Sequence, residues 1–171
     1  DLALLKLTSS FNTITGKYYY DNNNNLVYDS GDQPVTHQLV SDLTGSLISF
    51  TNIDGDYRII TVDTGSFVIQ PSLLNYYTSL PATQSVNFPS VGIIDSLNDF
   101  SAVMIPGIYD LSVNLIPLNR FRPGFSISYQ VNYSNVGTEP VNGTLVIILD
   151  TNLTFTSASI PPDIINGDTL I

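Results

Sequence analysis

Twelve consecutive residues, from Asp21 to Asp32, constrain this chain more than any other segment because they carry oxygen atoms at a regular spacing. Position seven of the segment, Val27, can add a backbone carbonyl. A calcium ion takes about six to eight hard oxygen ligands, and this spacing is that of an EF-hand calcium loop. The sequence therefore predicts a Ca²⁺ site here. Its side-chain ligands stand at positions one, three, five, nine and twelve: Asp21, Asn23, Asn25, Asp29 and Asp32.

The segment departs from the EF-hand pattern at two positions. Position six is normally Gly because the backbone there is left-handed, and Leu26 would cost about 1–2 kcal/mol in that conformation. Position twelve is normally Glu, and Asp32 is one methylene shorter. The predicted affinity is therefore weak, about 10⁻⁴–10⁻³ M, as in extracellular modules. An Asn-rich turn without metal is the alternative.

The residues on both sides of the segment are typical of strands. Residues 12–20 are rich in β-branched and aromatic side chains, and residues 35–40 follow Pro34 with a similar composition. We therefore expect the ion to hold two strands together. His37, the single histidine, is expected on the second strand as a surface or hydrogen-bonded residue.

Composition excludes several functional classes. The net charge of −10 and the pI of about 4.1 argue against nucleic acid and anionic membranes as partners. The absence of Cys excludes disulfides and thiol metal sites, and no apolar run reaches the roughly 18 residues of a membrane span. Apolar residues make up 43% of the 171 residues, enough for a packed core. The chain starts at Asp1 and stops at Ile171 in mid-pattern, as expected of a fragment of a longer polypeptide.

Turn signals recur every eight to twelve residues or so and predict an all-β fold of two tandem antiparallel β-sandwiches without helices. Strands are expected at residues 46–51 and 57–62, which form a hairpin around an Asp-Gly turn, and irregular edge structure at residues 71–99. Further strands are expected at residues 100–105, 111–117, 125–133, 144–149 and 153–160.

Three domains follow from this pattern. Residues 1–11 are an N-terminal strand or the end of an upstream unit, residues 12–108 the calcium-binding sandwich, and residues 109–171 a partial, Ig-like sandwich. The turn between the hairpin strands also carries oxygen atoms. They are either turn-forming groups or weaker ligands folded over the first loop: Asn52, Asp54 and Asp56.

The first sandwich resembles the SdrD B-like/Cna-B family of bacterial surface repeats. The resemblance covers about residues 12–105 and rests on residues 14–21, 29–34 and 51–57, although Asn52 stands where the family has Asp. It implies a calcium-stabilised, prealbumin-like sandwich that acts as a stalk module.

The second sandwich resembles the first half of a repeat sandwich, at residues 118–125, 133–138 and 153–158. Such repeats follow B-like modules in secreted proteins of Bacteroidetes, often exported by the type IX secretion system. Two tripeptides, at residues 95–97 and 168–170, resemble the O-glycosylation motif of that group, with Ser96 and Thr169 as the acceptors.

The residues therefore predict a non-enzymatic structural or adhesion stalk module of a secreted or cell-surface bacterial protein. Its expected partners are neighbouring domains of the same polypeptide, with a surface glycan or protein receptor as a further possibility. No paired nucleophile and base and no phosphate loop stand in the sequence. Two alternatives remain open. One is a glycan- or receptor-binding module that uses Tyr18–Tyr20, Tyr76 and Tyr77. The other is a fibre subunit whose second sandwich is completed by a neighbour's strand such as residues 2–7.

Overall fold

The computed structural model describes residues 10–171, and the N-terminal strand expected within residues 1–11 lies almost wholly outside them. The chain divides into two compact units, one ending at Ile108 and one beginning at Tyr109. The described residues form strands β1 to β15 and no helix, which confirms the all-β fold. Among these residues there is no helix long and apolar enough to cross a membrane.

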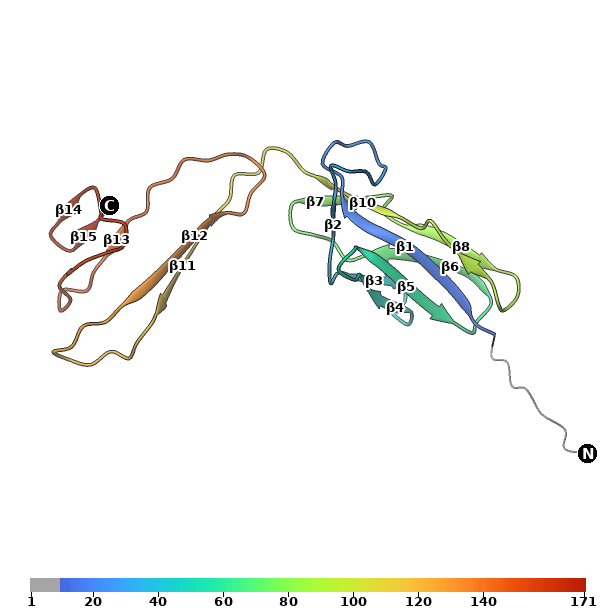
Figure 1. Cartoon of the computed structure of the whole chain (residues 1–171), viewed down its shortest axis with the longest axis horizontal. Coiled ribbons are helices and arrows are strands. Elements are labelled where there is room, and N and C mark those ends of the chain that lie inside the picture. Colours follow the sequence, from blue (N-terminus) through green and yellow to red (C-terminus); the bar gives the residue numbers. More distant parts are fainter. Residues whose placement is uncertain (1–9) are drawn as a thin grey trace, which may run out of the picture. The chain divides into compact units, whose positions relative to one another are not determined.

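The first unit is built from two sheets (Figure 1). The larger sheet has six strands: β1 (Asn12–Tyr20), β2 (Gln33–Pro34), β5 (Asp56–Thr61), β7 (Tyr77–Leu80), β9 (Ile94–Asp95) and β10 (Phe100–Met104). The smaller sheet has four strands in the order β4-β3-β6-β8: β3 (Leu39–Asp42), β4 (Ile48–Phe50), β6 (Gly65–Pro71) and β8 (Gln84–Phe88).

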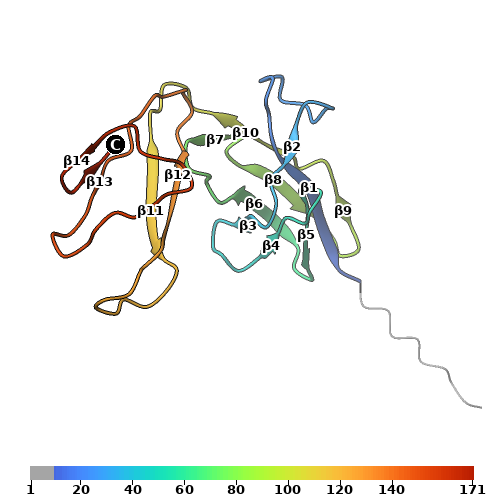
Figure 2. The ribbon, with the colours of Figure 1, turned by 60° about the vertical axis from the view of Figure 1, so that its left-hand side comes forward.

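Strand β1 is the common member of the larger sheet (Figure 2). Its first part pairs with β5 in antiparallel and with β9 in parallel orientation. Its last residues pair with β2 in antiparallel and with β10 in parallel orientation. The two parallel pairings are not predicted by the sequence, because parallel partners are joined by long connections that leave no local turn signal.

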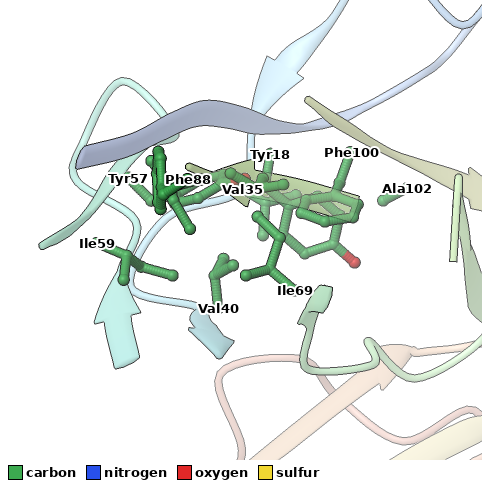
Figure 3. Close-up of a cluster of buried hydrophobic side chains, with 11 residues drawn as sticks. Tyr18, Val35, Val40, Tyr57, Ile59, Ile69, Phe88, Phe100 and Ala102 are labelled. Carbon is green, nitrogen blue, oxygen red and sulfur yellow. The ribbon is translucent and has the colours of Figure 1, made fainter. Parts of the chain in front are cut away.

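The core of the first unit lies between the two sheets (Figure 3). Strand β5 alternates between exposed and buried residues, which places Tyr57 and Ile59 on the inner face. The ring of Phe100 is fully buried and stacks on Tyr57 with ring centroids 6.2 Å apart. The eleven buried core residues come from both sheets and one connection: Ile14, Tyr18, Val35, Val40, Tyr57, Ile59, Ile69, Val86, Phe88, Phe100 and Ala102.

Glycine is required at two positions where the backbone is crowded. A Cβ atom on Gly16 of β1 would collide with the carbonyl of Asn98 and lie 2.8 Å from the Tyr57 hydroxyl. That hydroxyl donates a hydrogen bond of 2.5 Å to the Asn98 carbonyl. Gly55 has a φ of +78°, and a Cβ atom there would lie 2.5 Å from the carbonyl of Tyr18. These glycines allow the β9–β10 connection and the β4–β5 turn to approach β1 closely.

Several sequence-based predictions of strands and strand pairing in the first unit are wrong. The expected hairpin does not form, because β4 pairs with β3 while β5 pairs with β1, so the turn between them crosses from one sheet to the other. Residues 71–99 are not merely irregular, since they contain β7, β8 and β9. His37 lies outside the strands, exposed and with a φ of +56°. Periodicity within one segment does not reveal which strand becomes its partner.

The second unit consists of two small sheets. Strands β11 (Leu111–Pro117) and β12 (Tyr129–Asn135) form an antiparallel pair, so the predicted strand at residues 125–133 begins four residues later than expected. Residues 153–160 form no strand. The other sheet has three short strands: β13 (Ile147–Ile148), β14 (Ile165–Asn166) and β15 (Thr169–Leu170).

This second unit buries almost none of its apolar side chains. Leu170, at 7% exposure, is the one buried residue in 109–171. The β11–β12 register puts four apolar or aromatic residues on one face, with Val113 opposite Tyr133 and Leu115 opposite Val131. Of these, Val113, Tyr133 and Leu115 are exposed. Burial of apolar area is the main favourable term in folding, so the first unit holds the stability of the chain.

We therefore expect truncation of Phe100 to be far more costly than truncation of Val113. Replacing Phe100 by Ala leaves a cavity against Tyr18 and Tyr57 and lowers the free energy of unfolding by about 3–5 kcal/mol. Val113→Ala, on the exposed face of β11, changes it by about 0.5 kcal/mol or less. Urea unfolding of both variants checks this expectation, and equal losses would contradict the location of the core.

Candidate functional site

The predicted calcium segment is a loop that joins β1 to β2. Tyr20 pairs with Gln33 and Tyr19 with Pro34, so the two strands bring Asp21 and Asp32 to the same end of the sheet. The Asp21 N–H donates to the carbonyl of Ala102 on β10, at 3.1 Å. Strand β1 precedes the loop, as the sequence predicts, and the two-residue strand β2 follows it. The strand expected at residues 35–40 is wrong for residues 35–38, since β3 begins at Leu39. The loop is anchored to β1, β2 and β10.

The first and last carboxylates of the loop are buried. Asp21 is 3% exposed and Asp32 is 5% exposed. Asp21 accepts hydrogen bonds from the backbone N–H groups of Asn25, at 3.1 Å, and Leu26, at 2.8 Å. Asp32 accepts from the N–H groups of Asn22, at 3.0 Å, and Asp29, at 3.1 Å. Each carboxylate thus closes a different part of the loop with both of its oxygen atoms.

A second group of side chains meets on the exposed side of the loop. The amide groups of Asn23 and Asn25 both donate to Oδ2 of Asp29, at 2.9 and 2.8 Å. Oδ1 of Asp29 accepts from the Gly31 N–H at 3.0 Å. The Gly31 hydrogen bond, followed by those of Asn23 and Asn25, lowers the pKa of Asp29 below its ordinary value, which means that this environment favours the negative charge.

The backbone turns through the left-handed region inside the loop. Leu26 has a φ of +61°, as the EF-hand spacing predicts for position six, and Asn24 has a φ of +57°. Asn tolerates this conformation, whereas Leu does not. The loop therefore contains strain at Leu26, and the two hydrogen bonds to Asp21 from this region offset it.

Tyr28 docks the loop onto the sheet. Its ring meets the ring of buried Tyr19 edge-on, with centroids 5.3 Å apart, and the ammonium group of Lys17 lies 4.7 Å from its centroid. Burial raises the pKa of Tyr19; the hydrogen bond with Ser101 opposes the rise, and the nearby carboxylates, Asp21 first, add to it. An aromatic at position eight is not part of the ligand pattern, so the spacing of oxygen atoms does not predict a role for Tyr28.

The donor set fits a hard cation in its chemistry. Three carboxylates and two amides supply oxygen atoms, and among residues 10–171 no Lys, Arg or His forms an ion pair with Asp21, Asp29 or Asp32. The part of the chain that the structure describes contains no group of three or more His, Cys, Asp or Glu residues close enough to hold a metal ion. The loop brings together Asn23, Asn25 and Asp29, while Asp21 and Asp32 bond to separate backbone groups.

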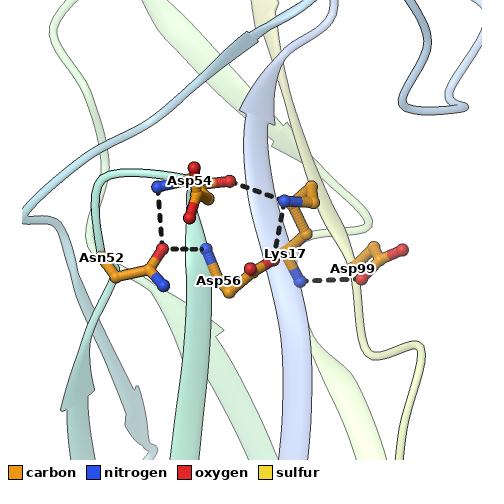
Figure 4. A network of polar contacts seen from close by, with 5 residues as sticks. All are labelled: Lys17, Asn52, Asp54, Asp56 and Asp99. Carbon is orange, nitrogen blue, oxygen red and sulfur yellow. Dashed lines mark hydrogen bonds and ion pairs between the residues drawn. The ribbon is translucent and has the colours of Figure 1, made fainter.

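The weaker ligand candidates lie at the β4–β5 turn (Figure 4). The side-chain oxygen of Asn52 accepts from the N–H groups of Asp54 and Asp56, both at 2.9 Å. Lys17 forms an ion pair with Asp56 at 2.6 Å and donates to the carbonyl of Asp54 at 2.6 Å. Lys17 also donates its backbone N–H to the carboxylate of Asp99, at 2.7 Å. These contacts hold the turn against β1, and the possible role of the three residues as ligands stays a prediction.

The remaining candidates have separate locations. Ser96 is exposed in the connection between β9 and β10, and Thr169 is partly buried in β15; their glycosylation stays a prediction. The proposed aromatic binding surface is wrong for Tyr18 and Tyr19, which are buried at 1% and 2% exposure. Burial also raises the pKa of Tyr18 to about 12, helped by Tyr20. These rings belong to the packed sandwich.

The strain at Leu26 gives a testable prediction. Leu26→Gly should raise the free energy of unfolding by about 0.5–1 kcal/mol, because relief of about 1–2 kcal/mol of strain exceeds the entropic cost of glycine. Asn24→Gly is the matched control and should gain less, since Asn already accepts a positive φ. Urea unfolding measures both, and a loss of stability in Leu26→Gly would contradict the loop conformation.

The lowered pKa of Asp29 gives a pH dependence. A carboxyl group whose pKa is lower in the folded state contributes stability above the unfolded value, 3.8, and this contribution is lost as the pH falls through the folded pKa. Asp29→Asn should therefore be less stable than the parent at pH 7, and the difference should shrink as the pH falls below 3.8 and through the lowered pKa of the folded state. Urea midpoints measured in chelator test this. Asn23→Ala keeps the carboxylate but removes one donor, and should show a smaller pH dependence than the parent.

No protein-family profile matches the chain, and no curated protein matches it. Among solved structures, the chain is similar to GBS52, the minor pilin of the Gram-positive pathogen Streptococcus agalactiae, with 12% sequence identity and a TM-score of 0.42. The match covers 58% of this chain and 47% of the pilin, so the chain spans about half of the length of that protein.

Proposed function

We propose that this chain is a calcium-stabilised, non-enzymatic structural module of a secreted or cell-surface bacterial protein. The observation that carries the proposal is the burial of two carboxylates, Asp21 and Asp32, in a loop where no cationic side chain of the described residues pairs with them. Buried charges are normally paired with an opposite charge or coordinate a metal.

The electrostatics of the loop favour a cation. Two like unit charges about 5 Å apart repel by about 3 kcal/mol at an effective dielectric of about 20, and the loop has three carboxylates within twelve residues. A bound Ca²⁺ would supply the opposing charge. The residues that would hold it are Asp21, Asn23, Asn25, Asp29 and Asp32, with the carbonyl of Val27.

The place of the loop in the fold explains how an ion would act as a structural element. The loop begins where β1 ends, and β1 pairs with β2, β5, β9 and β10. Fixing Asp21 and Asp32 relative to each other would hold the β1–β2 pairing and the docking of Tyr28 on Tyr19. A stalk module has to resist separation of β1 from β2 under mechanical load, and it needs no catalytic group.

The location and the neighbours of the module follow from the resemblance to B-like surface repeats and to repeat sandwiches of Bacteroidetes. We propose export by the type IX system, neighbouring domains of the same polypeptide as partners, and adhesion as the role of the parent protein. One observation favours the fibre alternative: the apolar face of β11 and β12 is uncovered, as it would be in a subunit completed by a neighbour's strand.

Calcium should raise the thermal stability of the first unit. At a dissociation constant of about 1 mM, a tenfold excess of Ca²⁺ adds about 1.4 kcal/mol to the free energy of unfolding, which raises the melting midpoint by several degrees. Thermal melting in calcium and in chelator measures this effect, with Mg²⁺ as the ionic control.

Variants locate the effect. Asp32→Asn and Asp29→Asn should lose most of the rise in melting midpoint that calcium causes. Asp163→Asn removes an exposed carboxylate of the second unit and should keep this rise. An unchanged midpoint in millimolar calcium, or an equal response in all three variants, would refute the site.

A further inference from the structure

The loop between β11 and β12 is a basic site in a strongly acidic chain. It carries Arg120 and Arg122, two of the five Lys and Arg residues, while no Asp or Glu occurs between residues 111 and 138. Both arginines are exposed, and neither forms an ion pair with any residue in 10–171. Two guanidinium groups are therefore available to an anionic partner, and each can bind a carboxylate through two hydrogen bonds.

The loop is held in shape by its own hydrogen bonds. The side-chain oxygen of Asn119 accepts from the Ser128 N–H at 2.9 Å, and its amide donates to the Ser126 carbonyl at 3.3 Å. The Phe125 N–H donates to the Arg122 carbonyl at 3.1 Å, which closes a turn through Gly124 at a φ of +80°. A preorganised loop loses less conformational entropy when it binds.

The surface of the loop combines charge with apolar area. A hollow of about 350 Å³ is lined by Asn119, Arg120, Arg122, Phe125 and Ser126. Phe121 and Phe125 are 60% and 73% exposed. Arg and aromatic residues are the side chains that contribute most to binding at protein interfaces, and a Phe ring has no polar group with which to bind a sugar hydroxyl. This composition favours a protein partner over an anionic polysaccharide.

We propose that this loop binds the acidic first unit of a second copy of the chain, at its β4–β5 turn. Between residues 10 and 108 the sequence has nine Asp and no Glu, against one Lys and one Arg. The β4–β5 turn presents Ile53, which is 75% exposed, next to the exposed carboxylate of Asp54. The turn is fixed by the two hydrogen bonds of Asn52 and by the N–H of Gly55, which donates to the Asn52 carbonyl at 3.1 Å.

The β4–β5 turn is preferred over the other acidic loop because its carboxylate is available. In the loop between β1 and β2, Asp29 accepts three hydrogen bonds, and Asp21 and Asp32 are buried. The carboxylate of Asp54 has no such partner among the described residues, and only its backbone carbonyl accepts from Lys17. An apolar side chain beside a free carboxylate complements a hollow that is lined by arginines and Phe125.

Net charge does not prevent this contact. Two copies of charge −10 repel, but at physiological ionic strength the Debye length is about 8 Å, so charges in direct contact decide the interaction. The interface joins different surfaces of the two copies, so after one contact the pair still has one free arginine loop and one free β4–β5 turn. The loop would therefore give concentration-dependent self-association.

Sedimentation velocity of the full chain over a range of concentrations tests the proposal. At physiological salt we expect reversible self-association that weakens steeply near 1 M NaCl, where the Debye length is about 3 Å. Arg120→Ala and Arg122→Ala together should weaken it by about tenfold or more, and Arg120→Lys with Arg122→Lys by less. Arg58→Ala, which removes an exposed guanidinium of strand β5, is the control for the loss of a surface arginine and should leave the association unchanged.

The partner surface has its own test. Asp54→Asn should weaken the association, whereas Asp163→Asn, at an exposed acid of the second unit, should not. The double arginine variant keeps the β4–β5 turn, and Asp54→Asn keeps the arginine loop. A mixture of the two should therefore form one contact per pair, and the association should end at dimers. Three results would overturn the proposal. The chain could be a monomer at all concentrations, or its association could be independent of salt and of the two arginines, as strand exchange would be. The association could also weaken in Asp163→Asn and not in Asp54→Asn. Circular dichroism establishes that the surface variants are folded.

Discussion

The first unit depends on the pairing of a single strand with four others. Strand β1 exchanges hydrogen bonds with β5 and β9 along its first part and with β2 and β10 along its last residues, so each part of the larger sheet is joined through it. Ile14 and Tyr18 of β1 point into the core, and Gly16 between them allows the Asn98 segment and the Tyr57 hydroxyl to approach. A disturbance of β1 therefore reaches both the sheet and the core, whereas strands such as β4 can move with less consequence.

The acidic loop is placed at the end of that strand, and its carboxylates are stabilised by N–H groups rather than by cations. Hydrogen bonds to a charged acceptor are stronger than neutral ones, so these N–H groups offset part of the cost of burying Asp21 and Asp32. The same bonds require a left-handed backbone at Leu26, so the loop combines strain with charge. A cation would offset the charge without changing the connection between β1 and β2. By ordering the loop it would also hold Tyr28 in its contacts with Tyr19 and Lys17.

The sequence predicts the local features of this protein well and its long-range pairings poorly. The strand at residues 12–20 and the left-handed position six of the loop depend on neighbouring residues, and both are found. The strand expected at residues 35–40 is found only from Leu39 onward. The partners of β5 and β9 depend on connections of many residues, so an Asp-Gly turn was interpreted as a hairpin although its strands belong to different sheets. Val86 and Phe88 were missed as core residues because a Pro-rich segment hides the short strand β8. Tyr28 was missed because ligand spacing concerns oxygen atoms only.

In the second unit, the alternation of apolar and polar residues is not accompanied by burial. Its β11–β12 pair has the clear alternation that predicts a half-buried sheet, yet the face that should be buried is exposed. A pair of seven-residue strands offers a face about 24 Å long and about 10 Å wide, so two such faces packed together would bury only about 500 Å². Stable interfaces bury about 1,200 Å² or more, so a second hairpin alone is too small to cover this face. Further strands that complement the sheet would have to supply the remaining area. The loop between β11 and β12, which carries Arg120 and Arg122, would then form a polar contact beside this apolar one.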